Sequence, residues 1–237
     1  MIQRPKDQRF VEGVLGNVRL FADILPGDLA ALARQSWVLE ARRGEAICRR
    51  AERMPGLFIV GYGLVKLALR SAEQRERVWR IVSAGQCFGA PASLLGRASR
   101  YEASAVADAK LIVVPSAPVF ALMEREARFG RSMVHMLAEH AFDLLAEFEA
   151  VSLMRSSQRL ASYLESLAEP AAGGGRPTVR LPVSKTLVAA RLGMKKETLS
   201  RLLRKLAADG LIEVSRREIA ILDPDALARL NGVPIQA

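Results

Sequence analysis

Cysteine and histidine, the side chains that most often bind transition metals, are almost missing from this sequence. Its 237 residues include two cysteines and two histidines. Cys48 and Cys87 are far apart and have no Cys-x-x-Cys spacing, so we expect packed or free thiols and no disulfide. The sequence therefore predicts no metal site.

Long hydrophobic runs are missing as well. The longest apolar stretch, residues 111–123, is too short to cross a bilayer and contains Pro115 and Pro118. The first ten residues carry charges but no apolar segment of signal-peptide length. We therefore expect a cytoplasmic protein that has no membrane partner.

The residue patterns of common enzyme classes are also absent. A metal-dependent enzyme built on β-strands needs two or three histidines with a carboxylate, and residues 37–117 contain no histidine. The sequence has no nucleophile elbow, no phosphate-binding glycine loop and no paired acidic motif. We therefore predict that the chain is not an enzyme.

Positive charge, by contrast, is in excess and unevenly distributed. The chain has 35 Lys and Arg residues against 25 Asp and Glu, a formal net charge of +10. Between Arg176 and Lys205, nine basic residues accompany a single acid, Glu197. A cluster of this density is typical of a protein that binds a polyanion, and nucleic acid is the natural candidate.

The basic cluster contains the pattern of two helices joined by a tight turn. Ser184 can cap the first helix, and Gly193 interrupts the apolar spacing where a turn is needed. The second helix runs from Lys195 to Asp209-Gly210. A helix-turn-helix needs small or apolar side chains where its helices cross, and the residues at those positions are Val188, Ala189, Leu192, Met194, Leu199 and Leu202.

The outward face of the second helix carries the side chains that would meet DNA. Glu197, Ser200 and Arg201 share one face near the N-terminal end, which a recognition helix inserts into the major groove. A glutamate can accept a hydrogen bond from cytosine, and an arginine can donate two to guanine, so we predict that these residues read bases. The predicted phosphate contacts are Lys185, Lys195, Lys196, Arg204 and Lys205. The alternative is an amphipathic helix whose polar face is simply solvated.

The first half of the chain predicts a β-rich domain. Residues 1–17 resemble a loose polar lead-in, and a short helical region follows at residues 20–33. Over residues 37–117, short apolar runs alternate with glycine turns, which predicts an antiparallel barrel of about seven or eight strands.

A helical period begins after this region, with a short helix at residues 119–126 and a long one at about 129–155. Apolar residues recur along the long helix every three or four positions, which approximates a heptad seam for pairing with a second copy. The alternative is that this stripe packs on the chain's own barrel, and both can hold on different faces. The proposed seam is Met133, Leu137, His140, Leu144, Phe148 and Val151.

The remaining segments frame the helix pair. A helix at residues 157–168 leads into a Gly/Pro-rich linker at 169–177. A short strand at 178–182 precedes the helix pair, and a hairpin of residues 211–214 and 218–222 follows it in the position of a wing.

This order of elements resembles the CRP/FNR family of bacterial transcription regulators over roughly residues 18–232. The motifs that carry the resemblance are G-Y-G at 61–63, G-Q-C-F-G at 85–89 and E-T-L-S-R at 197–201. The last is similar to the E-x-x-S-R recognition motif of the FNR branch, whose members favour TTGAT-like half-sites in an inverted repeat.

The resemblance implies an α+β fold with three parts. Residues 18–127 would form an antiparallel β-barrel of the cyclic-nucleotide-binding-like jelly-roll type that senses an effector. Residues 128–156 would form the dimerisation helix, and residues 157–237 a winged helix-turn-helix that binds double-stranded DNA.

The departures from the family pattern concern the effector. Cyclic-nucleotide binders have a Gly-Glu pair and then an Arg-Ser pair, whereas this chain has Gly89-Ala90 and Arg100-Tyr101. An effector pocket at these four residues therefore lacks the carboxylate that binds the ribose. We do not expect it to bind cAMP. The iron–sulfur members need four cysteines, which excludes that cluster here. Haem is an alternative cofactor, with His135 and His140 of the long helix as the candidate ligands. These two histidines are five residues apart and lie on different faces of that helix.

The function predicted from the sequence is a sequence-specific, homodimeric DNA-binding regulator with an unidentified signal. The alternatives are a haem-based sensor of nitric oxide or carbon monoxide, and a constitutive or architectural DNA-binding protein. An activator would also contact RNA polymerase, and a single sequence does not mark that surface.

Overall fold

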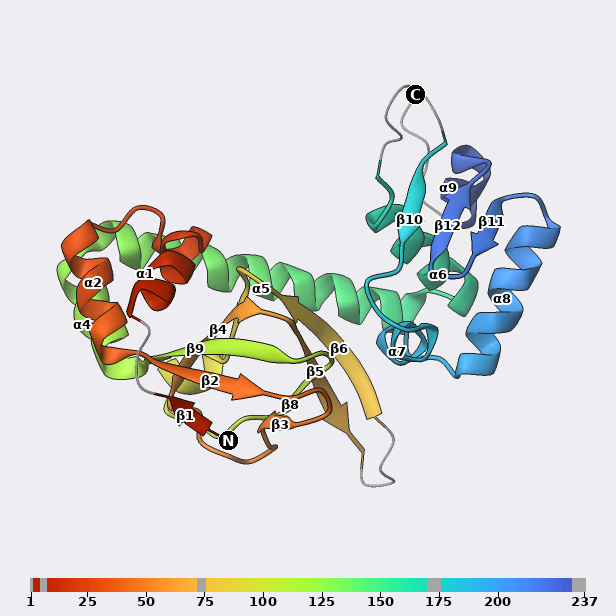
Figure 1. Cartoon of the computed structure of the whole chain (residues 1–237). Helices are drawn as coiled ribbons and strands as arrows, with labels where there is room; N and C mark the ends of the chain where they lie inside the picture. Colours follow the sequence, from red (N-terminus) through yellow and green to blue (C-terminus); the bar gives the residue numbers. More distant parts are fainter. Residues whose placement is uncertain (1, 5–7, 72–75, 170–175, 232–237) are drawn as a thin grey trace. The chain divides into compact units, whose positions relative to one another are not determined.

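The structure is a computed structural model that describes residues 2–4, 8–71, 76–169 and 176–231 (Figure 1). Its contacts group the chain into two units, Met1–Leu144 and Leu145–Ala237. Across the described residues, no helix combines the length and the apolar character that a bilayer span requires. The Gly/Pro-rich linker predicted at 169–177 lies mostly outside the described residues.

The N-terminal unit begins with a short strand, β1 (Ile2–Arg4), and a helix, where the sequence predicted a loose lead-in for residues 1–17. Helix α1 (Gln8–Gly16) buries Val11 and Leu15 completely. The prediction was wrong because the apolar residues of this short segment share one helical face, which packs against the core. A 3₁₀ turn, η1 (Arg19–Phe21), and helix α2 (Pro26–Gln35) follow.

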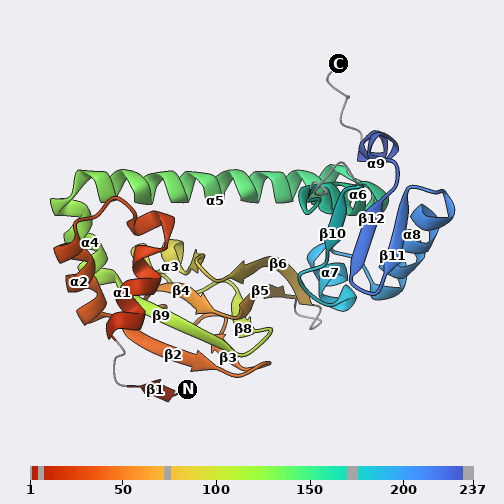
Figure 2. The same ribbon diagram turned by 45° about the horizontal axis from the view of Figure 1, so that its top comes forward.

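The β-rich region forms two open antiparallel sheets in a jelly-roll-like arrangement, and not a closed barrel (Figures 1 and 2). The first sheet has the order β1-β2-β9-β4-β7, and its strands are Ile2–Arg4, Trp37–Ala41, Ala109–Pro115, Gly56–Tyr62 and Cys87–Phe88. The second has the order β3-β8-β5-β6, and its strands are Ala46–Cys48, Glu102–Ala105, Leu64–Arg70 and Glu76–Ser83.

Gly63 marks the point where the chain leaves the first sheet for the second. Its φ of +88° is left-handed, and a Cβ there would lie 2.3 Å from the carbonyl oxygen of Asp108. Only glycine fits this close approach of two backbones.

The first sheet separates two apolar cores. Along β4, Leu57 and Ile59 face the core shared with the helices, whereas Phe58 and Val60 face the core between the sheets. This alternation follows from the two-residue period of a strand, and it explains why β4 reads as a continuous apolar run. Two short helices, α3 (Ala90–Leu94) and α4 (Ser116–Arg125), complete the covering of the sheets.

Helix α5 (Ala127–Leu153) corrects part of the predicted seam. Met133 is fully buried in the chain's own core, and Leu137 packs against that core, so Met133 cannot face a second copy. Phe129, on the same face, stacks on Phe21 with ring centroids 5.7 Å apart. The apolar stripe at the start of α5 is thus occupied within the chain, as the alternative interpretation expected.

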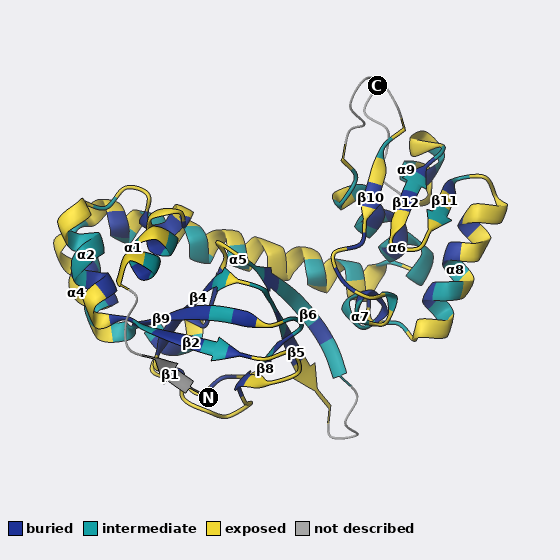
Figure 3. Ribbon diagram, viewed as in Figure 1, coloured by how far each residue is buried: buried dark blue, intermediate teal, exposed yellow. Residues whose placement is uncertain are grey.

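Within its described residues, the C-terminal unit contains the end of α5, four further helices and a small sheet (Figure 3). These four helices are α6 (Ser156–Ser166), α7 (Lys185–Arg191), α8 (Lys196–Ala208) and α9 (Pro224–Asn231). The sheet has the order β10-β12-β11, with strands Thr178–Arg180, Glu218–Ile221 and Ile212–Ser215. The hairpin of β11 and β12 matches the predicted wing.

Candidate nucleic-acid interface

Helix α7 is closed at both ends by local hydrogen bonds. Ser184 caps its start, because its hydroxyl oxygen accepts a 3.4 Å hydrogen bond from a backbone N–H of the first turn. At its end, Gly193 has a φ of +63°, and the N–H of Met194 donates to the carbonyl oxygen of Ala189 at 3.0 Å. This is the Schellman pattern, in which a left-handed glycine ends a helix. The chain can therefore turn directly into the next helix.

Helix α8 is anchored by its leucine face. Leu199, Leu203 and Leu206 are buried, and Ala189 of α7, at the predicted crossing, is 1% exposed. Of the six predicted core positions, Val188, Ala189, Leu192 and Leu199 are buried, and Met194 and Leu202 are half-buried. The apolar face of α8 therefore points into the unit and leaves the opposite face to solvent.

The structure places the predicted base-reading residues on this outward face. Glu197 and Arg201 are exposed, and Ser200 is half-buried. In the described part of the chain, no side-chain partner engages Glu197 or Arg201, so both are free to bind another molecule. Of the predicted phosphate contacts, Lys185 is half-buried, and the exposed ones are Lys195, Lys196, Arg204 and Lys205.

Two arginines that the sequence did not single out support the helix pair. Arg159 of α6 donates from Nε to the carbonyl oxygen of Leu192 at 3.0 Å and from Nη1 to that of Met154 at 2.6 Å. Arg191 of α7 forms an ion pair with Glu147 near the end of α5. Both side chains bond across elements that are distant in sequence, so no local motif marks them.

The wing adds further positive charge. Its turn consists of Arg216 and Arg217, both exposed, between the paired residues Ser215 and Glu218. Arg216 has a φ of +52°, a conformation that glycine or asparagine usually supplies in such a turn. Two adjacent arginines between strands are the signal that sequence reasoning could have used.

The predicted effector pocket contains closely packed side chains. Gly89 and Ala90 are buried, and a Cβ on Gly89 would lie 2.9 Å from the methyl carbon of Met54. The ring of Tyr101 packs edge-on against Trp79 with centroids 5.7 Å apart, whereas Arg100 is exposed. The structure therefore packs Tyr101 against the core between the sheets and leaves Arg100 exposed.

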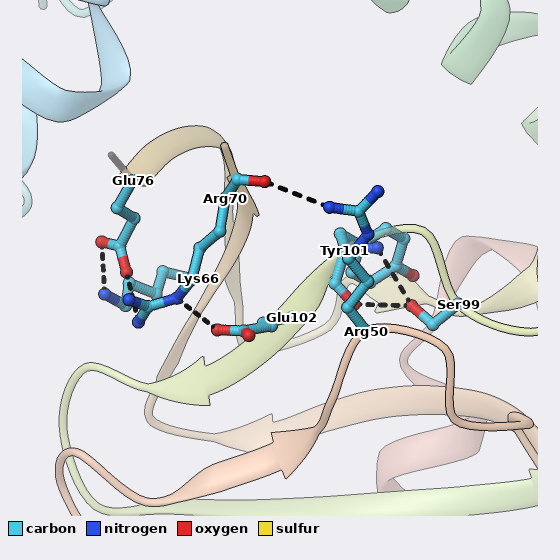
Figure 4. A network of polar contacts seen from close by, with 7 residues as sticks. All are labelled: Arg50, Lys66, Arg70, Glu76, Ser99, Tyr101 and Glu102. Atoms are coloured by element: carbon cyan, nitrogen blue, oxygen red, sulfur yellow. Dashed lines mark hydrogen bonds and ion pairs between the residues drawn. The ribbon is translucent and has the colours of Figure 1, made fainter. Parts of the chain in front are cut away.

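Two carboxylates of the second sheet, Glu76 and Glu102, are already paired with basic side chains. Glu102 accepts a 2.7 Å hydrogen bond from Arg70, and Glu76 accepts from Lys66 at 2.5 Å (Figure 4). Figure 4 also shows Tyr101 beside Ser99, whose hydroxyl donates to the carbonyl oxygen of Tyr101. The acid that directly follows Tyr101 is therefore held by an arginine on the neighbouring strand.

The two histidines of α5 line one cavity, although the sequence placed them on different faces of the helix. His140 is half-buried, and its Nε2 lies 2.8 Å from Nη1 of Arg80. Burial and then the charge of Arg80 lower the pKa of His140 below its ordinary value. His135 is exposed, and its Nε2 lies 3.1 Å from Oε1 of Glu139.

Comparisons with known proteins agree with this architecture. Residues 158–230 match the model of the Crp-like helix-turn-helix domain, and residues 38–126 match that of the cyclic nucleotide-binding domain. The transcriptional regulator LdrP of Thermus thermophilus is 31% identical over 198 residues, which cover 82% of this chain and 97% of that protein.

Solved structures show the same fold. FixK2 from Bradyrhizobium japonicum aligns with a TM-score of 0.73 at 20% identity, over 84% of this chain and 98% of its own. A CRP/FNR family regulator from Thermus thermophilus aligns with a TM-score of 0.63 at 23% identity, over 83% of this chain and 98% of that regulator. The chain belongs to the CRP/FNR family, whose members are transcriptional regulators with a DNA-binding helix-turn-helix and are not enzymes.

Proposed function

We propose that this protein is a sequence-specific regulator that binds double-stranded DNA through α8. One observation carries the proposal: Glu197 and Arg201 stand unpartnered, among the described residues, on the exposed face of a helix whose opposite face is buried. A carboxylate repels phosphate, so its presence among lysines favours contact with bases over general charge attraction.

The specificity that we propose is of the FNR type. The E-T-L-S-R motif at 197–201 places a glutamate, a serine and an arginine on one face of α8. On TTGAT-like half-sites, Arg201 would donate to the guanine and Glu197 would accept from the cytosine of the same base pair. Lys185, Lys195, Lys196, Arg204 and Lys205 would hold phosphates and set the salt dependence.

We further propose that the protein acts as a homodimer through the exposed apolar side of α5. Phe142, Leu145 and Phe148 are 74%, 63% and 71% exposed, and they recur every three residues. Exposed aromatic side chains on a long helix favour burial against a second helix of the same kind. This moves the proposed contact from Met133 to the later part of the predicted seam, where Leu144, Phe148 and Val151 are exposed.

These assignments give each part of the chain a separate role. Residues 18–127 would sense a signal, residues 128–156 would join two copies, and residues 157–237 would bind an inverted repeat whose half-sites lie about one helical turn apart. A change in the sensing domain would alter DNA affinity only if the signal binds two conformations unequally.

A haem-based gas sensor is the second candidate, because both histidines line one cavity. The described residues fit a haem poorly. The Nε2 of His140 already lies within hydrogen-bond distance of Arg80, and the Nε2 of His135 lies within ion-pair distance of Glu139. The walls also carry three arginines and two acids, which do not suit the apolar faces of a porphyrin.

Selection from a random DNA library tests the proposed function. Wild-type protein at physiological ionic strength should enrich an inverted repeat whose half-sites contain a G·C pair at one fixed position. Enrichment of no symmetric sequence, with equal affinity for random duplexes, would show a non-specific architectural protein instead.

A further inference from the structure

A cavity of about 600 Å³ lies in the N-terminal unit beside the first half of α5, apart from the pocket predicted at Gly89-Ala90. Its walls come from η1 and its flanking residues, the middle of β6, the turn before β7, the first residue of β7, and α5. This volume is in the range of sites that bind small molecules, about 300–1,000 Å³. Size alone does not identify a ligand, but the side chains around the cavity restrict its chemistry.

Arg80 is the central cation of this cavity. It is half-buried, and within the described residues its one side-chain partner is His140, at 2.8 Å. A guanidinium has only donors, so the Nε2 of His140 must accept, which requires a neutral imidazole. The hydrogen bond therefore orients Arg80 without neutralising it, and a half-buried cation without a counterion is costly.

Among the other charged groups that line the cavity, Arg19 and Glu139 neutralise each other, whereas Arg131 and the exposed acid Asp23 have no ion-pair partner among the described residues. Arg19 donates to Oε1 of Glu139 at 3.3 Å, and the same carboxylate oxygen lies 3.1 Å from Nε2 of His135. Arg131, one turn before His135 on α5, has no hydrogen-bond or ion-pair partner among the described residues. Arg80 and Arg131 are thus two cations at one cavity that lack a carboxylate partner in the described chain.

We propose that this cavity binds a small organic anion, held by Arg80 and Arg131 through its carboxylate or phosphate group. Guanidinium groups match the two oxygens of either anion with paired hydrogen bonds. His135 and His140 border the same space and supply further polar contacts. That the bound anion is the signal of the regulator rests on the proposed function, whereas the binding itself does not.

Isothermal titration of the full-length protein at fixed ionic strength tests the site, with inorganic phosphate and succinate as the probes. Saturable binding of phosphate alone identifies a phosphate-bearing ligand, and binding of succinate alone identifies a carboxylate. The uncharged 1,4-butanediol, which matches succinate in chain length, should not bind. Arg131→Gln should weaken binding about tenfold, because it removes one charge-assisted hydrogen-bonding group.

Arg128→Gln is the matched control, because Arg128 is exposed on the same helix and does not line the cavity. It should bind the probes as the wild type does. Arg80→Gln should abolish binding, and if that variant fails to fold, the exposed Arg131 decides the question alone. Absence of saturable binding by either probe, or equal losses in Arg128→Gln and Arg131→Gln, would overturn the proposal.

Two further measurements distinguish the anion site from a haem site and from the proposed DNA-binding function. A sharp Soret band on addition of haem, lost in His140→Ala, would assign the cavity to haem and overturn the anion site. DNA binding of the same samples is measured in parallel. A protein that binds succinate or phosphate but no DNA contradicts the proposed function and leaves the anion site standing.

Discussion

The Nε of Arg159 donates a 3.0 Å hydrogen bond to the carbonyl oxygen of Leu192, the C-cap residue of α7. The same guanidinium donates to Met154, just after α5. One side chain thus ties the last turn of α7 to the connection between α5 and α6. We infer that Arg159 positions the helix pair without touching DNA itself.

Replacing Arg159 with methionine should lower the free energy of unfolding by about 1–3 kcal/mol, because two backbone carbonyls lose a charged donor. Operator affinity should fall with it although every DNA-facing side chain is intact. Denaturant unfolding and operator titration measure the two effects. Arg229→Met, an exposed arginine of the same unit, is the control. Arg159→Lys should recover part of the stability, and equal stability of Arg159→Met and wild type would contradict the positioning role.

Arg201→Ala should reduce operator affinity by about 1–3 kcal/mol and relax the preference at one base pair. Lys196→Ala is the matched comparison on the same helix. It should weaken binding to specific and random DNA alike. The slope of the logarithm of affinity against the logarithm of salt concentration should become shallower by about one. Fluorescence anisotropy titrations on both DNAs distinguish the two roles. Equal losses of Arg201→Ala on both DNAs would reject its role in base reading.

Phe148→Glu should convert the dimer to a monomer, because it places a charge in the apolar contact proposed on α5. Sedimentation velocity measures the change. Leu95→Glu is the control, since Leu95 is 64% exposed but lies in the segment that connects α3 to β8. Met133→Ala should instead leave the assembly intact and lower the free energy of unfolding by about 2–5 kcal/mol, as expected for a buried methionine. A dimeric Phe148→Glu protein would place the contact elsewhere.

Arg216→Gly should weaken DNA binding while leaving the wing folded. Glycine accepts the positive φ of this turn without steric cost, so the variant removes a cation and relieves backbone strain of about 1 kcal/mol. Thermal unfolding should be unchanged or slightly raised, and affinity for random DNA should fall. Unchanged affinity at low salt would show that the wing does not reach the phosphates.

The stability of the protein should depend on His140 below neutral pH. Burial, followed by the charge of Arg80, lowers its pKa from the ordinary 6.5, and the opposing charges of Asp143 and Glu139 are smaller influences. The unfolded chain therefore binds a proton more readily, so the free energy of unfolding falls as the pH drops below about 6.5. In His140→Gln, the amide oxygen can accept from Arg80 without titrating. Urea unfolding between about pH 8 and pH 5 should show a smaller loss for the variant, and parallel profiles would contradict the assignment.

The helix-turn-helix could be predicted from sequence because its determinants are local. Ser184 caps its own helix, Gly193 supplies its own left-handed turn, and the leucines of α8 repeat at helical spacing. The outward placement of Glu197 and Arg201 follows from that spacing alone. The strands of the jelly roll were predictable for the same reason, since apolar runs between glycines mark them without reference to their partners.

Tertiary structure decided what each apolar or titratable side chain meets. Met133 and Phe148 belong to one repeating pattern, yet Met133 enters the chain's own core and Phe148 stays exposed. Arg80 and His140 are 60 residues apart and meet at 2.8 Å. Helical and strand periods specify which face a residue occupies, but only the packing of whole elements determines what lies opposite that face.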